Sequence, residues 1–418
     1  MPDQVLPLRA RASIQEHWLI RRLDTIIGEL MQREEVDMWI ITGRENNEDP
    51  VLLTMLPPSM FHASWFRTIL VFCRDKAGSV ERLTLTRGSH ASELLPIYPN
   101  IWDHRHEDEW SCLARLVKER DPERIAVNMS SAWALADGLT CSDHQHLVEA
   151  LGTAHSERLA SDQRLAVGWL ERRLSEELSA YDGIVRMAHE LIAEAFSSQV
   201  IHPGITTAAD VVWWFREAVL DGRLTTWFQP SVSLQRRGVQ GMLHGNEIIL
   251  PGDLITCDFG IHYLGLATDT KHQAYVLHRD ETQWPAELQE LFERGLLLQD
   301  LHLQEFNVGR TGNEVLDCSL RAAQARGIAG AVIYTHPLGF HGHAAGSIIG
   351  MTGQQQVPAG LGDYPLFDDT CYSVGVEVTG TIAAWGGQTV RLMMEEDIAL
   401  TGKSPRYLNQ RQEEVYLI

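Results

Sequence analysis

The chain is poor in positive charge and has none of the long apolar runs that membrane proteins carry. Its 418 residues include 35 Lys and Arg against 56 Asp and Glu, for a formal net charge of −21. This balance repels nucleic acid and anionic membrane surfaces, so we expect neither as a partner. No run reaches the roughly 18 apolar residues of a membrane span. The first residues lack the apolar core of a secretory signal, and we therefore expect a cytoplasmic protein.

The cysteines are few and form no CxxC pair. Such scattered thiols predict neither a disulfide framework nor a zinc knuckle. With 44 % apolar and 22 % charged residues, the chain does not have the composition of a disordered protein. At about 150 residues per domain, its length predicts two or three domains.

The first part of the chain alternates between helical and strand patterns. Residues 14–33 carry apolar side chains at helical spacing, and residues 36–42 (VDMWIIT) predict a short strand. Residues 68–72 and 82–86 flank a KAGS turn and predict a hairpin. We therefore expect an α/β domain over residues 1–165.

In residues 166–418 the strand and helix patterns come in separate runs. A helix is predicted after HPGITTAAD, with Thr206 or Thr207 as its N-cap. Strand-like segments include DLITCDFG, CYSVGVEVTGTI and VRLMMEEDIAL. This arrangement predicts an α+β domain with an antiparallel sheet.

Five residues of this second part have the types and order of a two-metal hydrolase site: Asp258, Asp269, His336, Glu377 and Glu395. Oxygen-rich ligand sets with one imidazole suit Mn²⁺, Co²⁺ or Zn²⁺. Two such ions, roughly 3.5–4 Å apart, can share a water and clamp the oxygen of a scissile carbonyl. Each residue alone also has a structural interpretation, as a turn cap, a solvated strand face or a hydrogen-bonded histidine.

The order of these segments resembles the metal-dependent pita-bread peptidase family, which holds methionine aminopeptidases, aminopeptidase P and prolidase. The matching segments are PGDLITCDFG, TDT, the H-x-x-G-x-x-x-H of residues 336–343, YSVGVE and the final EED. The resemblance implies a pita-bread catalytic domain in residues 166–418. Residues 1–165 would be the smaller N-terminal domain that aminopeptidase P and prolidase carry, which favours the proline-directed branch.

By that resemblance, Asp258 is a terminal ligand of one ion, and Asp269 and Glu395 bridge both ions. His336 and Glu377 would bind the other ion, and Glu377 would also act as general base.

The resemblance further implies that His343 steadies the developing oxyanion and that His244 lines the substrate cleft. Met393 stands where the proline-directed enzymes carry an arginine, and Arg391 lies two residues earlier on the same strand face. We expect Arg391 to contact the substrate.

Two further departures from the family pattern concern the neighbours of the ligands. Val378-Thr379-Gly380 follows Glu377 where the family has Pro-Gly, and Thr270-Lys271-His272 follows Asp269 where a Thr-Arg pair is usual. The tryptophans Trp213, Trp214 and Trp227 are candidates for the lining of a substrate pocket.

The resemblance thus implies a metallo-aminopeptidase or dipeptidase of the Xaa-Pro type that hydrolyses small peptides. Its cofactors would be two divalent ions, Mn²⁺ before Co²⁺ or Zn²⁺, which share a bridging hydroxide, and the enzyme would be a homodimer. Two alternatives stay open. One is a non-peptidase C–N hydrolase or lyase on the same fold, as in creatinase. The other is a metal-poor binding module, like the peptidase-like domains of eukaryotic histone chaperones.

Overall fold

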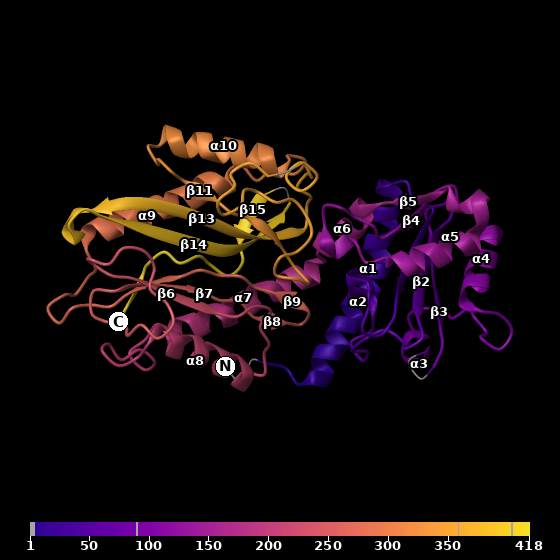
Figure 1. Cartoon of the computed structure of the whole chain (residues 1–418), viewed down its shortest axis with the longest axis horizontal. Coiled ribbons are helices and arrows are strands. Elements are labelled where there is room, and N and C mark those ends of the chain that lie inside the picture. Colours follow the sequence, from indigo (N-terminus) through magenta and orange to yellow (C-terminus); the bar gives the residue numbers. More distant parts are fainter. Residues whose placement is uncertain (1–4, 89–90, 358, 403) are drawn as a thin grey trace. The chain divides into compact units, whose positions relative to one another are not determined.

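The computed structural model describes residues 5–88, 91–357, 359–402 and 404–418 (Figure 1). It forms two compact units, Pro7–Arg172 and Arg173–Ile418, and Val5 and Leu6 also belong to the second unit. The division follows α6 (Gln163–Glu171), so it lies beyond the predicted boundary between residues 165 and 166. Among the described residues, no helix is long and apolar enough to cross a membrane.

The N-terminal unit is built on a five-stranded sheet with the order β3-β2-β1-β4-β5. β1 pairs with β2 and β2 with β3 in antiparallel fashion, whereas β1–β4 and β4–β5 are parallel. The β2–β3 pair confirms the predicted hairpin. The strands are β1 (Met38–Gly43), β2 (Thr68–Arg74), β3 (Val80–Thr86), β4 (Ile125–Val127) and β5 (Leu159–Ser161).

Helices flank this sheet, and local caps fix where two of them begin. The Asp49 side chain accepts from the first amides of α2, and the Asp108 side chain accepts from those of α4. The helices are α1 (Leu8–Arg33), α2 (Pro50–Met55), α3 (Ala91–Leu94), α4 (Glu109–Arg120), the 3₁₀ turn η1 (Ala134–Ala136), α5 (Cys141–Ser156) and α6.

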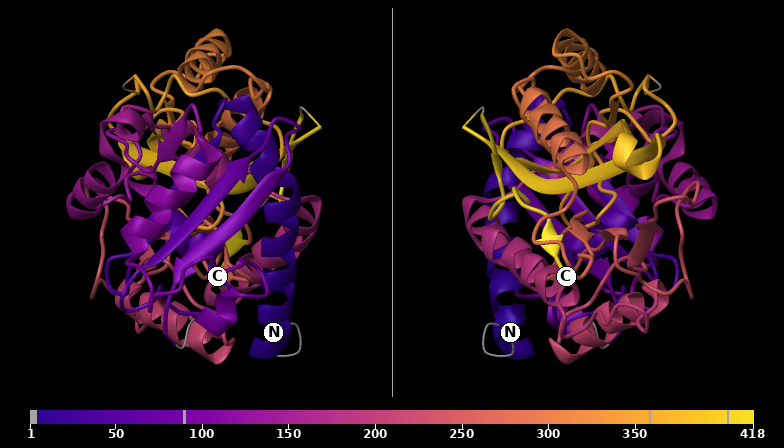
Figure 2. Two further views of the ribbon diagram at one scale, coloured as in Figure 1. Left: turned by 90° about the vertical axis from the view of Figure 1, so that its right-hand side faces the viewer. Right: turned by 90° about the vertical axis from the view of Figure 1, so that its left-hand side faces the viewer.

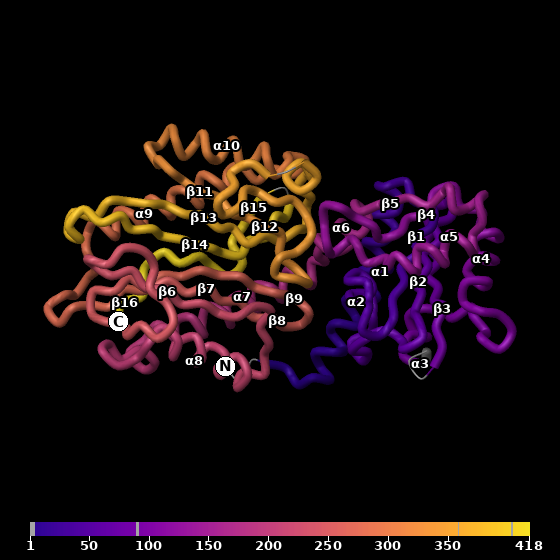
Figure 3. The backbone as a smooth tube through the Cα atoms, viewed as in Figure 1, coloured from indigo at the N-terminus to yellow at the C-terminus, as the bar shows by residue number. Residues whose placement is uncertain are grey.

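The C-terminal unit holds two larger sheets. One has the order β16-β10-β7-β6, and the other has the order β11-β13-β14-β15 with β12 also paired to β13 (Figure 3). All their pairs are antiparallel except β10–β16, so the α+β prediction is confirmed. The strands of the first sheet are β6 (Ser231–Gln235), β7 (Leu254–Asp258), β10 (Gln273–Tyr275) and β16 (Tyr416–Leu417). Between β7 and β10 lies the small pair β8 (His262–Tyr263) and β9 (Leu266–Ala267).

A long hairpin dominates the second sheet. Its strands β13 (Thr370–Ile382) and β14 (Gln388–Thr401) pair from Thr370↔Leu400 to Ile382↔Gln388. The turn contains η2 (Ala383–Trp385) and two glycines with positive φ, Gly386 and Gly387, a conformation that costs glycine little. The remaining strands are β11 (Val332–Ile333), β12 (His336–Leu338) and β15 (Ser404–Tyr407).

Two pairs of helices complete this unit. α9 (Ala286–Leu303) packs on β13 and β14, and α10 (Gly312–Ala325) packs on α9 (Figure 2). α7 (Ser175–Ala195) contacts α8 (Ala208–Asp221), which packs on β6. Thr207, one of the two predicted caps, accepts from the amide of Asp210 and starts α8.

Candidate metal centre

A cavity of about 500 Å³ opens in the C-terminal unit at the ends of β7 and β12 and beside β14. Its apolar wall includes Trp227, Phe228, Tyr334, Met351 and Met393. Its charged wall, which we call the front cluster, consists of Asp258, Asp269, Lys271, His336 and Glu395. Four of the five predicted ligands therefore line one cavity.

His336 lies at the centre of the front cluster. β12 pairs with β13 in a register that sets His336 opposite Ser373. Its Nε2 atom is 3.3 Å from Asp269 Oδ2 and 3.4 Å from Glu395 Oε1. Burial alone would lower the pKa of His336, but hydrogen bonds to the two carboxylates raise it to about 10. A cation is therefore strongly favoured at this point.

Two residues that the sequence did not single out hold the carboxylates in place. The Ser373 hydroxyl has one proton to donate and lies 2.8 Å from Glu395 Oε1 and 3.1 Å from the carbonyl oxygen of Asp269. The Asp269 amide donates to both carboxyl oxygens of Asp397. Burial, with the nearby charge of Asp269, raises the pKa of Asp397 well above its usual range. Asp397 thus holds the backbone of Asp269 in place.

Lys271 extends into the same group of charges. Its Nζ atom is 3.1 Å from Asp258 Oδ2 and forms a second ion pair with Glu395 Oε2. Although burial alone would raise the pKa of Glu395, Lys271 and His336 hold it below its usual range. One ammonium group therefore joins two of the predicted ligands.

Glu377, the fifth predicted ligand, has a different partner. Arg391 Nη2 lies 2.5 Å from Glu377 Oε2. Among the described residues, neither side chain belongs to the lining of the cavity. The roles of Glu377 as ligand and general base, and of Arg391 as a substrate contact, stay predictions.

The two predicted substrate histidines lie in different settings. His343 lines the cavity, with its ring centroid 4.8 Å from that of His336 and 5.1 Å from that of Trp227. His244 is exposed in the segment between β6 and β7, and the described cavity lining does not include it. The structure thus brings only His343 to the carboxylates.

Trp227 forms a fixed part of the apolar wall. Its indole Nε1 donates to the Thr268 carbonyl at 2.8 Å, and its ring covers Gly342, where a Cβ atom would lie 2.0 Å from ring carbon Cε2. Trp213 and Trp214 line a separate hollow on α8, so of the three tryptophan candidates only Trp227 borders the cavity.

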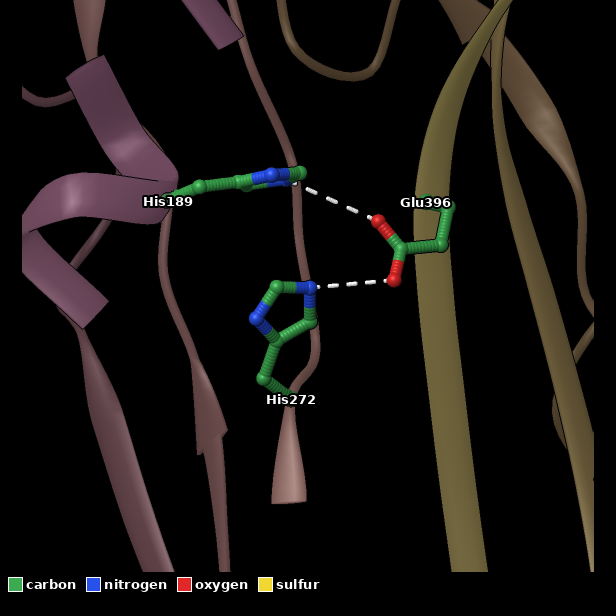
Figure 4. A group of neighbouring side chains, drawn as sticks. All are labelled: His189, His272 and Glu396. Carbon is green, nitrogen blue, oxygen red and sulfur yellow. Dashed lines mark hydrogen bonds and ion pairs between the residues drawn. The ribbon is translucent and has the colours of Figure 1, made fainter. Parts of the chain in front are cut away.

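A second buried group lies directly behind the front cluster. We call it the back cluster: His189 from α7, His272 and Glu396 from β14 (Figure 4). Glu396 Oε1 is 3.0 Å from His272 Nε2 and accepts from the Gln412 amide at 2.7 Å. Glu396 Oε2 faces His189 Nε2 at 3.6 Å. Burial, together with the nearby His272, lowers the pKa of His189 to about 4, so this ring is neutral at neutral pH.

The front cluster has the chemistry of a divalent-cation site. Asp258 Oδ1 and Asp269 Oδ1 are buried, and neither has a hydrogen-bond partner among the described residues. Ligand atoms of Asp269, His336 and His343 lie within 4.8 Å of one another. Unpaired buried carboxylate oxygens are costly without a cation, so these residues fit a divalent ion.

Comparison with known proteins identifies the protein family of the C-terminal unit. Residues 183–387, which contain β13 and four of the five front-cluster residues, match metallopeptidase family M24. The C-terminal unit belongs to this family, and the predicted pita-bread fold is confirmed. No curated protein sequence matches the chain significantly.

Solved structures share the fold over nearly the whole chain. The X-Pro aminopeptidase from Thermotoga maritima MSB8 has a TM-score of 0.67 at 15 % identity and covers 93 % of this chain and 100 % of its own. The Xaa-Pro dipeptidase from Bacillus anthracis has a TM-score of 0.61 at 17 % identity and covers 96 % of this chain and 99 % of its own. The N-terminal domain of the FACT complex subunit SPT16 from chickpea (Cicer arietinum) reaches 0.60 at 10 % identity and covers 94 % of this chain and 96 % of its own. At such identities the likeness shows the fold alone, because both peptidases and a FACT complex subunit share it.

Proposed function

We propose that the protein is a metal-dependent hydrolase that cleaves small peptides of the Xaa-Pro type. The observation that carries this proposal is the convergence of Asp269 and Glu395 on His336 Nε2 inside a cavity, within 3.4 Å. Two carboxylates and one imidazole are a donor set that divalent ions such as Mn²⁺ accept. Membership of family M24 and the likeness to X-Pro peptidases support the same reaction class.

In this proposal Asp269, His336 and Glu395 hold the ion, and Ser373 and Asp397 orient its carboxylates. A bound divalent ion supplies Lewis acidity, which polarises a carbonyl and makes a coordinated water more acidic. His343, on the same wall, is placed to donate toward a substrate oxygen. The residues that orient the ligands matter because their loss usually costs metal affinity.

The shape of the cavity supports a small substrate. Its volume of about 500 Å³ falls within the roughly 300–1,000 Å³ typical of ligand pockets. Trp227 and Phe228 give one side an apolar surface, which suits a proline ring. Charged groups occupy the other side, where a peptide's polar backbone and termini can bind.

The test uses the full chain stripped of metal and reloaded with Mn²⁺, then Co²⁺ and Zn²⁺. We expect the loaded protein to hydrolyse Xaa-Pro dipeptides or tripeptides, and Asp269→Asn to lose at least roughly 100-fold in kcat/KM. Asp221→Asn, at an exposed position that ends α8, is the matched control and should keep full activity. If no metal restores hydrolysis of any Xaa-Pro peptide by the wild type, the proposal is wrong.

A second candidate is cleavage of a non-peptide C–N bond, by hydrolysis or elimination. The observation that favours it is the pairing of predicted ligands with fixed cations, Lys271 with Asp258 and Glu395, and Arg391 with Glu377. A panel of small amidines and sulfonium compounds, assayed beside the dipeptides, separates the two candidates. Turnover of a panel member without peptide hydrolysis would favour the second.

A further inference from the structure

Lys271 sits where the resemblance to two-metal peptidases leads one to expect a metal ion. Its backbone forms a bridge with Glu395: the Lys271 amide donates to the Glu395 carbonyl at 3.0 Å, and the Glu395 amide donates back at 3.3 Å. Residues directly opposite in such a pair extend their side chains to the same face. The Lys271 side chain is only 15 % exposed. The Lys271 ammonium group is therefore a largely buried part of the cavity wall.

The ammonium uses oxygen atoms that a second metal ion would need. Asp258 Oδ2 and Glu395 Oε2 both pair with Lys271 Nζ. By the family resemblance, Asp258 is the terminal ligand of one ion and Glu395 bridges both. The first ion thus competes with a covalently attached cation for its ligands.

On the other side of the cluster, no lysine or arginine among the described residues is paired with Asp269. His336 Nε2 approaches Asp269 Oδ2 and Glu395 Oε1, and Asp269 Oδ1 is buried without a partner among the described residues. Arg391 is paired with Glu377 outside the cavity, so Glu377 is left out of this ligand set. One complete set of oxygen and nitrogen donors therefore remains available.

The balance of charges in the cavity also favours one bound divalent ion. The cavity is lined by three carboxylates, from Asp258, Asp269 and Glu395, and by one lysine. One divalent ion plus the ammonium of Lys271 balances the three negative charges when His336 is neutral, as a metal ligand must be. Two divalent ions plus Lys271 would leave an excess of positive charge in a largely buried site, which is costly.

We propose that Lys271 replaces one of the two cations of the family's metal centre, so that this protein binds a single divalent ion. The ion is held by Asp269, His336 and Glu395, and Lys271 takes the position between Asp258 and Glu395. This inference rests on the metal-dependent function proposed above and narrows it to a mononuclear site.

The experiment measures metal stoichiometry rather than turnover. The full chain is stripped with a chelator, titrated with Mn²⁺ by calorimetry and analysed by elemental analysis after gel filtration. Electron paramagnetic resonance then distinguishes an isolated Mn²⁺ ion from an exchange-coupled pair. We compare the wild type with Lys271→Ser and Lys271→Thr, which remove the ammonium and open space. Lys76→Ser removes an exposed lysine in the other unit and is the control.

We expect one Mn²⁺ per chain in the wild type and in Lys76→Ser. Two per chain, with an exchange-coupled signal, are expected in Lys271→Ser or, if that variant does not fold, in Lys271→Thr. Two ions in the wild type, no ion in the wild type, or one ion in a folded Lys271 variant would each overturn the inference. One bound ion without peptide hydrolysis would instead overturn the proposed peptidase function and leave the inference intact.

Discussion

The front and back clusters are neighbours on the same chain segments, yet their chemistry differs. Glu395 and Glu396 are adjacent in β14, and Lys271 and His272 are adjacent before β10, so alternation along extended backbone sends one of each pair to either cluster. The front cluster keeps buried carboxylate oxygens without partners beside a cavity. In the back cluster, Glu396 Oε1 is hydrogen-bonded to His272 and to the Gln412 amide, whereas Glu396 Oε2 has no hydrogen-bond partner among the described residues and faces the neutral His189 ring. The comparison indicates that the segments around residues 271–272 and 395–396 carry the proposed metal site on one face and a buried structural cluster on the other.

The largest expected effect is a loss of metal affinity when a residue of the front cluster is replaced. Loss of residues that merely orient metal ligands usually costs 10–100-fold in affinity, so Asp269→Asn, which removes a ligand, should weaken Mn²⁺ binding by at least about 100-fold. Titration calorimetry measures this. The metal-free variant should still fold, because asparagine has the shape of aspartate and keeps an oxygen that can face His336. If a folded Asp269→Asn protein bound Mn²⁺ with wild-type affinity, the front cluster would not be the metal centre.

The second expected effect is a loss of stability when a residue of the back cluster is replaced. His272→Leu leaves Glu396 buried without its ring partner, and breaking a buried pair in this way typically costs about 3–5 kcal/mol. Urea unfolding measures the loss. The folded variant should still bind Mn²⁺ as the wild type does, and a loss of bound metal without a loss of stability would contradict the anchoring role.

A third test uses pH, because His189 has a folded-state pKa of about 4 against 6.5 in the unfolded chain. Between these values the unfolded chain binds a proton that the folded protein does not. The free energy of unfolding should therefore fall as the pH drops from 6.5 toward 4, with this group contributing up to roughly 1.4 kcal/mol per pH unit. The groups that face His189 are His272, Glu396 and the Asn409 amide.

Urea unfolding at pH 7 and pH 5 checks this expectation in the wild type and in His189→Gln, whose dependence on pH should be shallower. His302, which burial brings to a pKa of about 3, keeps its own contribution in both proteins. Equal slopes in the two proteins would show that His189 does not contribute.

The smallest effect concerns the pair outside the cavity. The Arg391 side chain is 38 % exposed, but that of Glu377 is only 11 % exposed. Arg391→Leu leaves this carboxylate without its partner, which should lower the free energy of unfolding by about 1–3 kcal/mol and leave the Mn²⁺ count unchanged. A gain of a second Mn²⁺ would show that Glu377, once released, completes a second site.

The fold could be predicted because its signals are local. Two strand-like runs that flank the KAGS turn marked the β2–β3 hairpin, and HPGITTAAD, with Thr206 or Thr207 as N-cap, marked the start of α8. The exposed position of His244 could not be predicted, because the segment between β6 and β7 has no periodic pattern that would fix its direction.

The sequence pointed to four of the five predicted ligands as members of one site but not to their ion-pair partners, and their role as metal ligands stays a prediction. The order Asp258, Asp269, His336 and Glu395 pointed to one cavity, and the structure brings all four to it. The contact of Lys271 with Glu395 depends on the register between segments 124 residues apart, which no local pattern specifies. A partial signal existed, since Lys271 lies two residues after Asp269 and extended backbone would place both on one face. The contacts of Ser373 with Glu395 and of Asp397 with the Asp269 amide also depend on pairing between distant segments.

The contact between the Trp227 indole and Gly342 has a consequence for the evolution of specificity. Because any side chain at position 342 would collide with the ring, the indole and the loop that carries His343 can change only together. New substrates are therefore more easily reached through Met351 and Met393, whose flexible thioether side chains border the same hollow and tolerate replacement.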